Sequence, residues 1–303
     1  MNALLANDTR GSVPGEHWGS WRTTTNLEAL LNRSGVTVVD NLGLGQLQPD
    51  GPIWNRIEKA DMLVVNGEGS VHSRTRTAVA ILSALVTANQ RGIPVWIVNH
   101  ACWDCDELIP NYAHADFIAV RDISSKGYLA QFGISARLAA DCSFLSPPAE
   151  AKQRNRLLIC SGLRPPEQNL IRKWSSALKC SEVVLCNDFY PRFSPADAVK
   201  STSADQCFEL FASSRFVITS SFHGCIFAAV HGKPFLPVAV KGQPPKAVVA
   251  AEEAMGGHAW HICSEGPHYV VSNYEEIAAT ILTRTRWLRQ RAGFNVPEKS
   301  NHL

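Results

Sequence analysis

His223 is the side chain of this sequence best suited to moving protons, and it lies in a Ser-Ser-Phe-His-Gly turn at residues 220–224. Imidazole has an ordinary pKa near neutrality, so it can serve as a general acid or a general base. The apolar run at residues 216–219 is typical of a buried strand, and the small, apolar run at 225–230 predicts a short helix buried on every side. Either serine can cap that helix, whose N-terminus attracts anions. The turn therefore predicts an anion site containing a histidine; a hydrogen-bonded structural histidine is the simpler alternative.

Two arginines are placed where they could bind anions. Arg121 ends an expected strand at residues 115–120, and Arg164 follows another at 157–161. A guanidinium at the carboxyl end of a strand suits a carboxylate or a phosphate. The alternatives are an internal salt bridge between Arg121 and Asp122, and an exposed loop cation for Arg164.

A glycine-rich segment at residues 66–72 follows an expected strand at 61–65, and we interpret it as a turn before a helix at 75–90. Its polar side chains could meet sugar hydroxyls, and Arg74 beyond it could meet an anion, although tight packing alone would explain the glycines. The residues concerned are Asn66, Glu68, His72 and Arg74.

His17 and Trp18 lie where the first expected strand, at residues 2–7, leads into a helix that Ser20 or Thr23 could cap. Aromatic rings at such a place can stack on sugars, but Trp18 could equally belong to the core. We assign both residues to the acceptor side.

Cys102 and Cys105 have the spacing of a zinc-binding pair. A structural zinc site needs about four ligands, and only His100 and His114 could complete this one. We therefore interpret the pair as ordinary thiols and expect no metal. Nine cysteines, several of them in apparent core segments, indicate a reducing compartment rather than a disulfide framework.

Strands and helices alternate along the chain, and a polar stretch with a Pro-Pro pair at residues 146–155 interrupts the alternation. This pattern predicts an α/β protein with two Rossmann-like, doubly wound domains facing each other across a cleft. We expect an N-terminal domain at 1–148 on the acceptor side and a C-terminal domain at 155–273 on the donor side. A terminal helix within 274–303 would be long enough to cross back to the first domain, and residues 260–263 would form a strand.

Composition excludes several classes of protein. The 303 residues are 45% hydrophobic and 18% charged with a net charge of +2, which argues against nucleic-acid binding. No apolar run approaches the ~18 residues of a membrane span, and the first residues lack the features of a signal peptide. We expect a cytoplasmic protein.

Four segments, in this order and spacing, resemble the polysaccharide pyruvyl transferase family, and the likeness is best over residues 61–240. They are Arg121-Asp122-Ile123-Ser124-Ser125 with Gly127, Leu129 and Gly133; Asp141-Cys142-Ser143-Phe144-Leu145; Ser220-Ser221-Phe222-His223-Gly224-Cys225-Ile226-Phe227-Ala228; and Gly232-Lys233-Pro234-Phe235. The resemblance implies a two-domain fold of the GT-B glycosyltransferase type. It also implies transfer of the enolpyruvyl group of phosphoenolpyruvate to two hydroxyls of a sugar, which gives a pyruvate ketal and phosphate.

The resemblance places Arg121 and His223 on the family's functional positions, and we assign them catalytic roles. Many members carry an arginine two residues before this histidine, where this chain has Ser221. Arg164, Arg74 or Lys241 would then have to supply the missing cation. The expected donor side comprises Arg164, Ser220, Ser221, Gly224 and Lys241.

The implied partners are phosphoenolpyruvate and a glycan of a bacterial surface polysaccharide or its lipid-linked precursor. No cofactor is expected, because phosphoenolpyruvate is itself the donor substrate. Peripheral membrane association and the oligomeric state stay open. The alternatives are a glycosyltransferase that uses a nucleotide sugar and a non-catalytic carbohydrate-binding protein on the same fold.

Overall fold

The computed structural model describes residues 1–10, 18–43, 46–47, 53–160, 168–186, 201–239 and 246–293. His17, Arg164 and Lys241 lie outside these ranges. The chain divides into two compact units. Unit 1 comprises Met1–Val13, Thr23–Cys142 and Gln290–Leu303, and unit 2 comprises Pro14–Arg22 and Ser143–Arg289.

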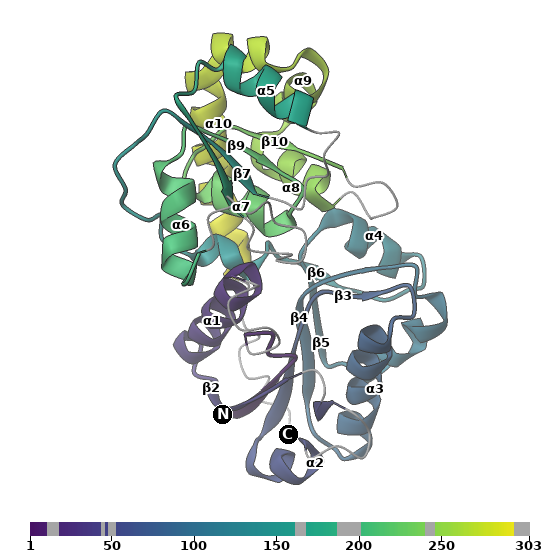
Figure 1. The fold of residues 1–303 in the computed structure, drawn as a ribbon. Helices are drawn as coiled ribbons and strands as arrows, with labels where there is room; N and C mark the ends of the chain where they lie inside the picture. The colour runs from purple at the N-terminus through teal and green to yellow at the C-terminus, as the bar shows by residue number, and fades with distance from the viewer. Residues whose placement is uncertain are drawn as a thin grey trace. The chain divides into compact units, whose positions relative to one another are not determined.

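Unit 1 is built on a parallel six-stranded sheet with the strand order β2-β1-β3-β4-β5-β6 (Figure 1). The strands are β1 (Asn2–Ala6), β2 (Thr37–Leu42), β3 (Met62–His72), β4 (Val95–Trp103), β5 (Phe117–Val120) and β6 (Arg137–Leu138). The helices are α1 (Trp18–Arg33), α2 (Ile53–Arg56), α3 (Arg76–Gln90) and α4 (Ile123–Ala130), with 3₁₀ segments η2 (Ile57–Lys59), η3 (Asp106–His114) and η4 (Cys142–Leu145). The start of α1, up to Arg22, and the part of η4 from Ser143 on belong to unit 2.

The central strands of unit 1 are buried on both faces. Leu63 and Val65 of β3 join one core cluster with α3, and the alternate residues Met62 and Val64 are equally buried. Successive side chains of a strand point to opposite faces, so both faces of this sheet are covered. The doubly wound arrangement predicted for this part of the chain is therefore confirmed.

Unit 2 is built on a parallel four-stranded sheet with the order β10-β9-β7-β8. The strands are β7 (Arg156–Cys160), β8 (Glu182–Cys186), β9 (Phe216–Thr219) and β10 (Phe235–Pro237). The helices are α5 (Gln168–Ala177), α6 (Ala204–Ser213), α7 (Phe222–Val230), α8 (Lys246–Met255), α9 (Gly257–Glu265) and α10 (Pro267–Ala292). Aromatic side chains fill its core, where Phe208 and Phe211 meet Phe227 of α7 edge to face.

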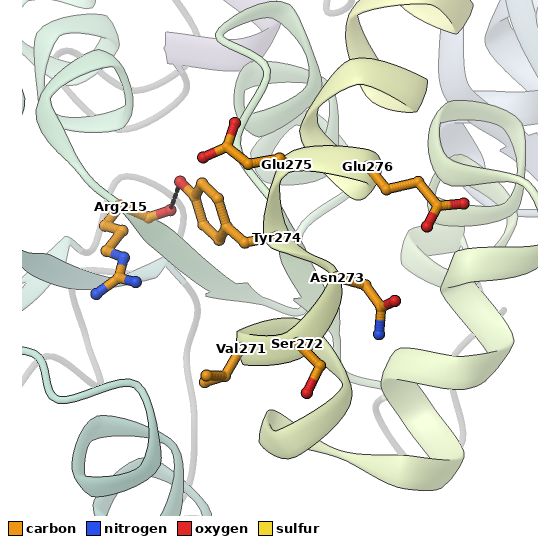
Figure 2. Close-up of a pocket in the computed structure, with 7 residues that line it drawn as sticks. All are labelled: Arg215, Val271, Ser272, Asn273, Tyr274, Glu275 and Glu276. Carbon is orange, nitrogen blue, oxygen red and sulfur yellow. Dashed lines mark hydrogen bonds between the residues drawn. The ribbon is translucent and has the colours of Figure 1, made fainter.

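Asn273 interrupts the helical geometry of α10 with φ −123° and ψ 22°. A surface pocket at this break is lined by Arg215 and residues 271–276 (Figure 2). The hydroxyl of Tyr274 donates to the backbone oxygen of Arg215 at 2.8 Å. None of the site residues predicted from the sequence lines this pocket, so we do not assign the function to it.

Two sequence predictions for secondary structure are wrong. Residues 260–263 are not a strand but part of α9, in which Trp260 is exposed and Ile262 is buried. The segment 66–72 is not a turn, because β3 continues through it to His72 and pairs with β4. Its glycines accommodate a shift in the register of that pairing between Glu68 and Val71.

All nine cysteines are unpaired thiols, and only Cys263 is exposed. Cys180 is half-buried, and the other seven are buried. In the part of the chain that the structure describes, no helix combines the length and the apolar character needed to cross a bilayer.

Candidate functional site

The turn between β9 and α7 is held by a short chain of hydrogen bonds in unit 2. Ser221 caps α7, because its Oγ accepts from the backbone N of Gly224 at 3.3 Å. The backbone N of Ser221 donates to Oγ1 of Thr219, which itself donates to the backbone oxygen of Cys160 at 2.6 Å. A Cβ at Gly224 would lie 3.2 Å from Cβ of Thr219 and closer still to its Oγ1. Only glycine fits there, so the turn is fixed in one conformation.

Helix α7 is buried over almost its whole surface, as its uniformly apolar sequence predicts. All of its residues from His223 to Val230 are buried. It ends at Gly232, whose φ of +65° is in the left-handed region, and the N of Lys233 donates to the backbone oxygen of Ala228 at 2.9 Å. A helix packed in this way gives the residues of its first turn a rigid support.

His223 lies in the first turn of α7 and is 9% exposed. The backbone of Gly19, in the first described turn of α1, lies directly against its ring. A Cβ at Gly19 would be 2.5 Å from Cβ of His223 and closer still to Cγ and Nδ1 of the imidazole. Both residues belong to unit 2. The imidazole is therefore held between its own helix and a segment that only glycine allows to come so close.

Trp18 neighbours this contact in the chain, and it also belongs to unit 2. Its Nε1 is buried and has no hydrogen-bond partner among the described residues. Trp18 thus belongs to the same unit as Ser220, Ser221, His223 and Gly224. The sequence had placed Trp18 on the acceptor side, an assignment that stays a prediction.

His231, which caps the C-terminal end of α7, has a structural role. His231 donates through Nδ1 to the backbone oxygen of Phe227 at 2.7 Å, and its Nε2 accepts from the backbone N of Ala149 at 3.0 Å. Burial lowers its pKa to about 4, and the positive charges of Lys233 and Arg289, with that of Arg22, act in the same direction. The neutral ring therefore links the backbone at Ala149 to the C-terminal end of α7 through two hydrogen bonds.

Arg121 forms a buried ion pair in unit 1. Its Nη1 lies 2.8 Å from Oδ2 of Asp141, and the two side chains are 3% and 1% exposed. The Oγ1 of Thr23 donates to the other carboxylate oxygen at 3.3 Å. The salt bridge weighed from the sequence therefore exists, but the partner is Asp141. Asp122 instead caps α4 by accepting from the N of Ser125 at 2.7 Å.

Asn66, in the middle of β3, is the centre of a buried polar network that includes Asn99 in the middle of β4 and Asn7 directly after β1. Its Nδ2 donates to Thr24 at 3.3 Å and to Glu68 at 3.2 Å. Its Oδ1 accepts from Asn99 at 3.1 Å, and its backbone oxygen accepts from Asn7 at 2.6 Å. The structure joins Asn66 to Glu68, and their acceptor-binding role stays a prediction. Sequence reasoning missed Asn7 and Asn99, although each follows a short apolar run, as Asn66 does.

The ring of His100 packs against the backbone of this network at Gly67. Its Nδ1 donates to the backbone oxygen of Ala119 at 3.1 Å, so its Nε2 accepts from the hydroxyl of Tyr112 at 3.0 Å. Complete burial lowers the pKa of His100 to about 3 and keeps the ring neutral. A Cβ at Gly67 would lie 3.0 Å from Cγ of His100 and closer to its Cβ, so the backbone beside Glu68 rests on this ring.

The Cys102–Cys105 pair lies at the end of β4. Burial raises the pKa of Cys102 to about 12 and also raises that of Cys105, so both sulfurs are protonated at neutral pH. The ring nitrogens of His100 are both engaged, and His114 contacts Asn89 at 3.0 Å. Within the described ranges, no group of three or more His, Cys, Asp or Glu side chains is arranged to hold a metal ion.

His72 and Arg74 lie beyond the network, at and after the end of β3. His72 stacks on Trp103 with ring centroids 4.5 Å apart, and Arg74 pairs with Glu107 at 2.6 Å on the exposed surface. The acceptor-binding roles of His72 and Arg74 stay predictions. The roles proposed for His17, Arg164 and Lys241 stay predictions.

Solved structures define the class of fold. The UDP-GlcNAc 2-epimerase from Neisseria meningitidis bound to UDP-GlcNAc matches with a TM-score of 0.62 and 13% identity over 97% of each chain. A putative UDP-N-acetylglucosamine 2-epimerase from Listeria monocytogenes matches with a TM-score of 0.60 and 13% identity, over 97% of this chain and 93% of the other. These similarities and the two parallel sheets establish a GT-B-like α/β fold.

The family follows from the sequence itself. The family model described as polysaccharide pyruvyl transferase matches residues 15–242, and the chain belongs to this family. No curated protein matches the sequence. The protein is therefore a transferase that modifies polysaccharide, on a GT-B-like scaffold.

Proposed function

We propose that this transferase moves the pyruvyl group of phosphoenolpyruvate onto two hydroxyls of one sugar in a bacterial surface polysaccharide or its lipid-linked precursor. The methylene carbon of phosphoenolpyruvate gains a proton and becomes the methyl group. Two hydroxyl oxygens bond to the adjacent carbon, the bond from that carbon to the phosphate oxygen breaks, and inorganic phosphate leaves. The two hydroxyl protons balance the reaction, one ending on carbon and one on phosphate. No cofactor is needed, because the enol phosphate is already activated.

The observation that carries the proposal is the placement of His223 in a chain of this family. It lies in the capped first turn of α7, against the backbone of Gly19. Phosphoenolpyruvate has a carboxylate and a phosphate, and the positive end of a helix dipole favours such groups. An imidazole in the same turn can donate the proton that the methylene carbon needs, or accept one from an attacking hydroxyl. We assign Ser220, Ser221 and Gly224 to the donor side on this basis.

Arg121 has a different place in the proposal. Its guanidinium is paired with Asp141 in the interior of unit 1. We infer that Arg121 acts as a positioning residue, which holds Asp141 and with it the segment that begins at Cys142. The cations that would neutralise phosphoenolpyruvate are proposed to be Arg164 and Lys241, in place of the arginine that many relatives carry at position 221.

The test is to supply the purified protein with phosphoenolpyruvate and an oligosaccharide prepared from a pyruvylated polysaccharide by mild-acid removal of its ketals. Inorganic phosphate and a new ketal methyl signal in the proton NMR spectrum should appear together and in equal amounts. Parallel reactions receive UDP-sugars in place of phosphoenolpyruvate. His223→Gln is the control, since glutamine keeps hydrogen-bonding capacity but cannot transfer a proton.

Each outcome decides between the alternatives. Release of a nucleoside diphosphate with no phosphate from phosphoenolpyruvate would support a glycosyltransferase. Sugar binding without turnover of either donor would support a carbohydrate-binding protein. Phosphate release that His223→Gln leaves unchanged would remove His223 from the chemistry.

A further inference from the structure

Four polar side chains form a buried cluster on adjacent strands of unit 1, and we call it the asparagine cluster: Asn7, directly after β1, Asn66 and Glu68 in β3, and Asn99 in β4. Each is at most 6% exposed. Asn7, Glu68 and Asn99 have φ values of +61°, +43° and +54°, a left-handed conformation that costs free energy for residues other than glycine. Ligands of open parallel sheets bind at the carboxyl ends of strands, and Asn7 directly follows the carboxyl end of β1.

The orientation of each amide in the cluster is determined by its partners. Both polar ends of the Asn66 side chain are engaged within the unit, and Oδ1 of Asn99 accepts from the backbone N of Cys142 at 2.9 Å. Glu68 accepts from Asn66 and from Oγ1 of Thr9 at 2.8 Å. Asn66 and Asn99 therefore hold the cluster together and are not suited to contact a ligand through these atoms.

Asn7 differs from the other two asparagines. Its Nδ2 lies 2.6 Å from the backbone oxygen of Asn66, which can only accept a hydrogen bond, so the amide cannot be flipped. Its Oδ1 is then an acceptor, buried on a side chain that is 1% exposed, and no donor in the described ranges reaches it. Native proteins seldom leave such an atom unsatisfied, because burial removes its bonds to water. Oδ1 of Asn7 therefore needs a hydrogen-bond donor from outside the cluster.

We propose that Oδ1 of Asn7 accepts a hydrogen bond from a hydroxyl of the acceptor sugar. The chemistry of the cluster selects the ligand class. Carboxamide and carboxylate oxygens attract hydroxyl hydrogens and repel the oxygens of a phosphate or carboxylate. The cluster thus suits a neutral polyol and not phosphoenolpyruvate. The inference rests on the proposed function only in taking a sugar as the substrate.

Two variants at Asn7 separate ligand binding from support of the fold. Asn7→Gly tolerates the left-handed backbone but removes both ends of the amide, whereas Asn7→Asp keeps an oxygen in place of Oδ1 and replaces the donor to Asn66 with a charged carboxylate oxygen. A purely structural role through Nδ2 would make the aspartate variant at least as damaging as the glycine variant. A ligand-binding role through Oδ1 predicts the opposite order.

The experiment measures sugar binding without any donor, so its outcome is independent of phosphoenolpyruvate chemistry. Methyl α-glucoside, methyl α-galactoside and methyl α-mannoside are titrated into wild type and both variants, with saturation-transfer difference NMR as the readout. Thermal unfolding monitored by circular dichroism confirms that each variant is folded. At least one glycoside should bind wild type. Its Kd should be about three- to tenfold higher in Asn7→Gly, because this is the usual loss of affinity when one neutral hydrogen bond is removed. Asn7→Asp should stay within about twofold of wild type.

The inference would be overturned if both variants bound the glycosides as wild type does, if both lost binding equally, or if wild type bound none of the three. Failure of the proposed function has a different signature. In that case glycosides bind through Asn7 as described, but phosphoenolpyruvate yields no phosphate in the presence of any acceptor.

Discussion

Gly19→Ala should inactivate the enzyme although it removes no functional group. The added Cβ would lie 2.5 Å from Cβ of His223 and nearer to the ring, whereas ordinary van der Waals contact begins at about 3.4 Å. Either the imidazole or the first described turn of α1 must therefore move by about 1 Å. Helix α7 is buried along its length, so Cβ of His223 stays in place; the first described turn of α1 is displaced and the ring is turned out of its position.

The magnitude follows from two separate effects. A methyl group forced into a packed interior typically costs about 1–3 kcal/mol of unfolding free energy. A misplacement of about 1 Å at a reacting group costs on the order of 10²-fold in rate. Gly19→Ala should thus remain folded at 25 °C but lose about 10²-fold in the rate of phosphate release from phosphoenolpyruvate.

The assay measures that rate and also follows the environment of the His223 ring. Phosphate release is measured at saturating phosphoenolpyruvate and acceptor, and the His223 imidazole resonances are followed by ¹⁵N-correlated NMR. The matched control is Gly127→Ala in α4, where an added Cβ meets nothing within 4 Å and activity should be unchanged. Activity of Gly19→Ala within a few-fold of wild type, with the His223 resonances unmoved, would refute the reasoning.

The remaining predictions concern three other side chains. His223→Ala and His223→Gln should both lower the rate of phosphate release by ~10²–10⁴-fold while leaving the melting temperature nearly unchanged; high activity of the glutamine variant would make His223 structural. Arg121→Met should cost about 3–5 kcal/mol in urea unfolding because it leaves Asp141 charged and buried, and adding Asp141→Leu should recover much of this loss; additive losses would contradict a coupled pair. Stability should fall as pH drops from about 6.5 through about 4, because unfolding lets His231 bind a proton that its folded environment excludes, a contribution of ~3 kcal/mol. His231→Gln should reduce but not abolish that pH dependence in urea titrations, because His100, with its pKa lowered to about 3, contributes in the same direction; an unchanged slope would exclude His231 as a source.

Much of the fold could be predicted because local chemistry and tertiary structure agree. The apolar runs that predicted β1, β5, β7 and β9 are buried strands, and the uniformly apolar segment after Gly224 is a fully buried helix. Gly35 and Gly232 end their helices in the left-handed conformation, as expected of glycine after a helix. Strands covered on both faces leave no polar residue to confuse the pattern.

The errors arose where tertiary contacts override local preference. Glycines usually mark turns, but the segment around Gly67 is paired strand, and the absence of a side chain there makes room for His100. The aromatic and β-branched run around Trp260 suggested a strand, but a three- or four-residue apolar run cannot separate a strand from one face of a helix.

The candidate site was predictable only in part for a similar reason. His223 and its capping serine were identified because they are close together in the sequence. Gly19 is far from His223 along the chain, and no local pattern shows that a glycine is needed to admit a distant ring. The partner of Arg121 was mistaken for its neighbour Asp122, since a sequence cannot show which of two nearby carboxylates the fold brings to a guanidinium.

The distribution of thiols makes this enzyme convenient for spectroscopy. Of the nine cysteines only Cys263, on α9, is exposed, and burial raises the pKa values of Cys102, Cys105 and Cys225. Maleimide reagents react with thiolates at accessible sites, so Cys263 should be labelled first; because burial also raises the pKa of Cys263, the reaction should be run somewhat above neutral pH. The natural sequence thus offers a single reporter position in unit 2, and no cysteine has to be removed before fluorescence is used to follow substrate binding.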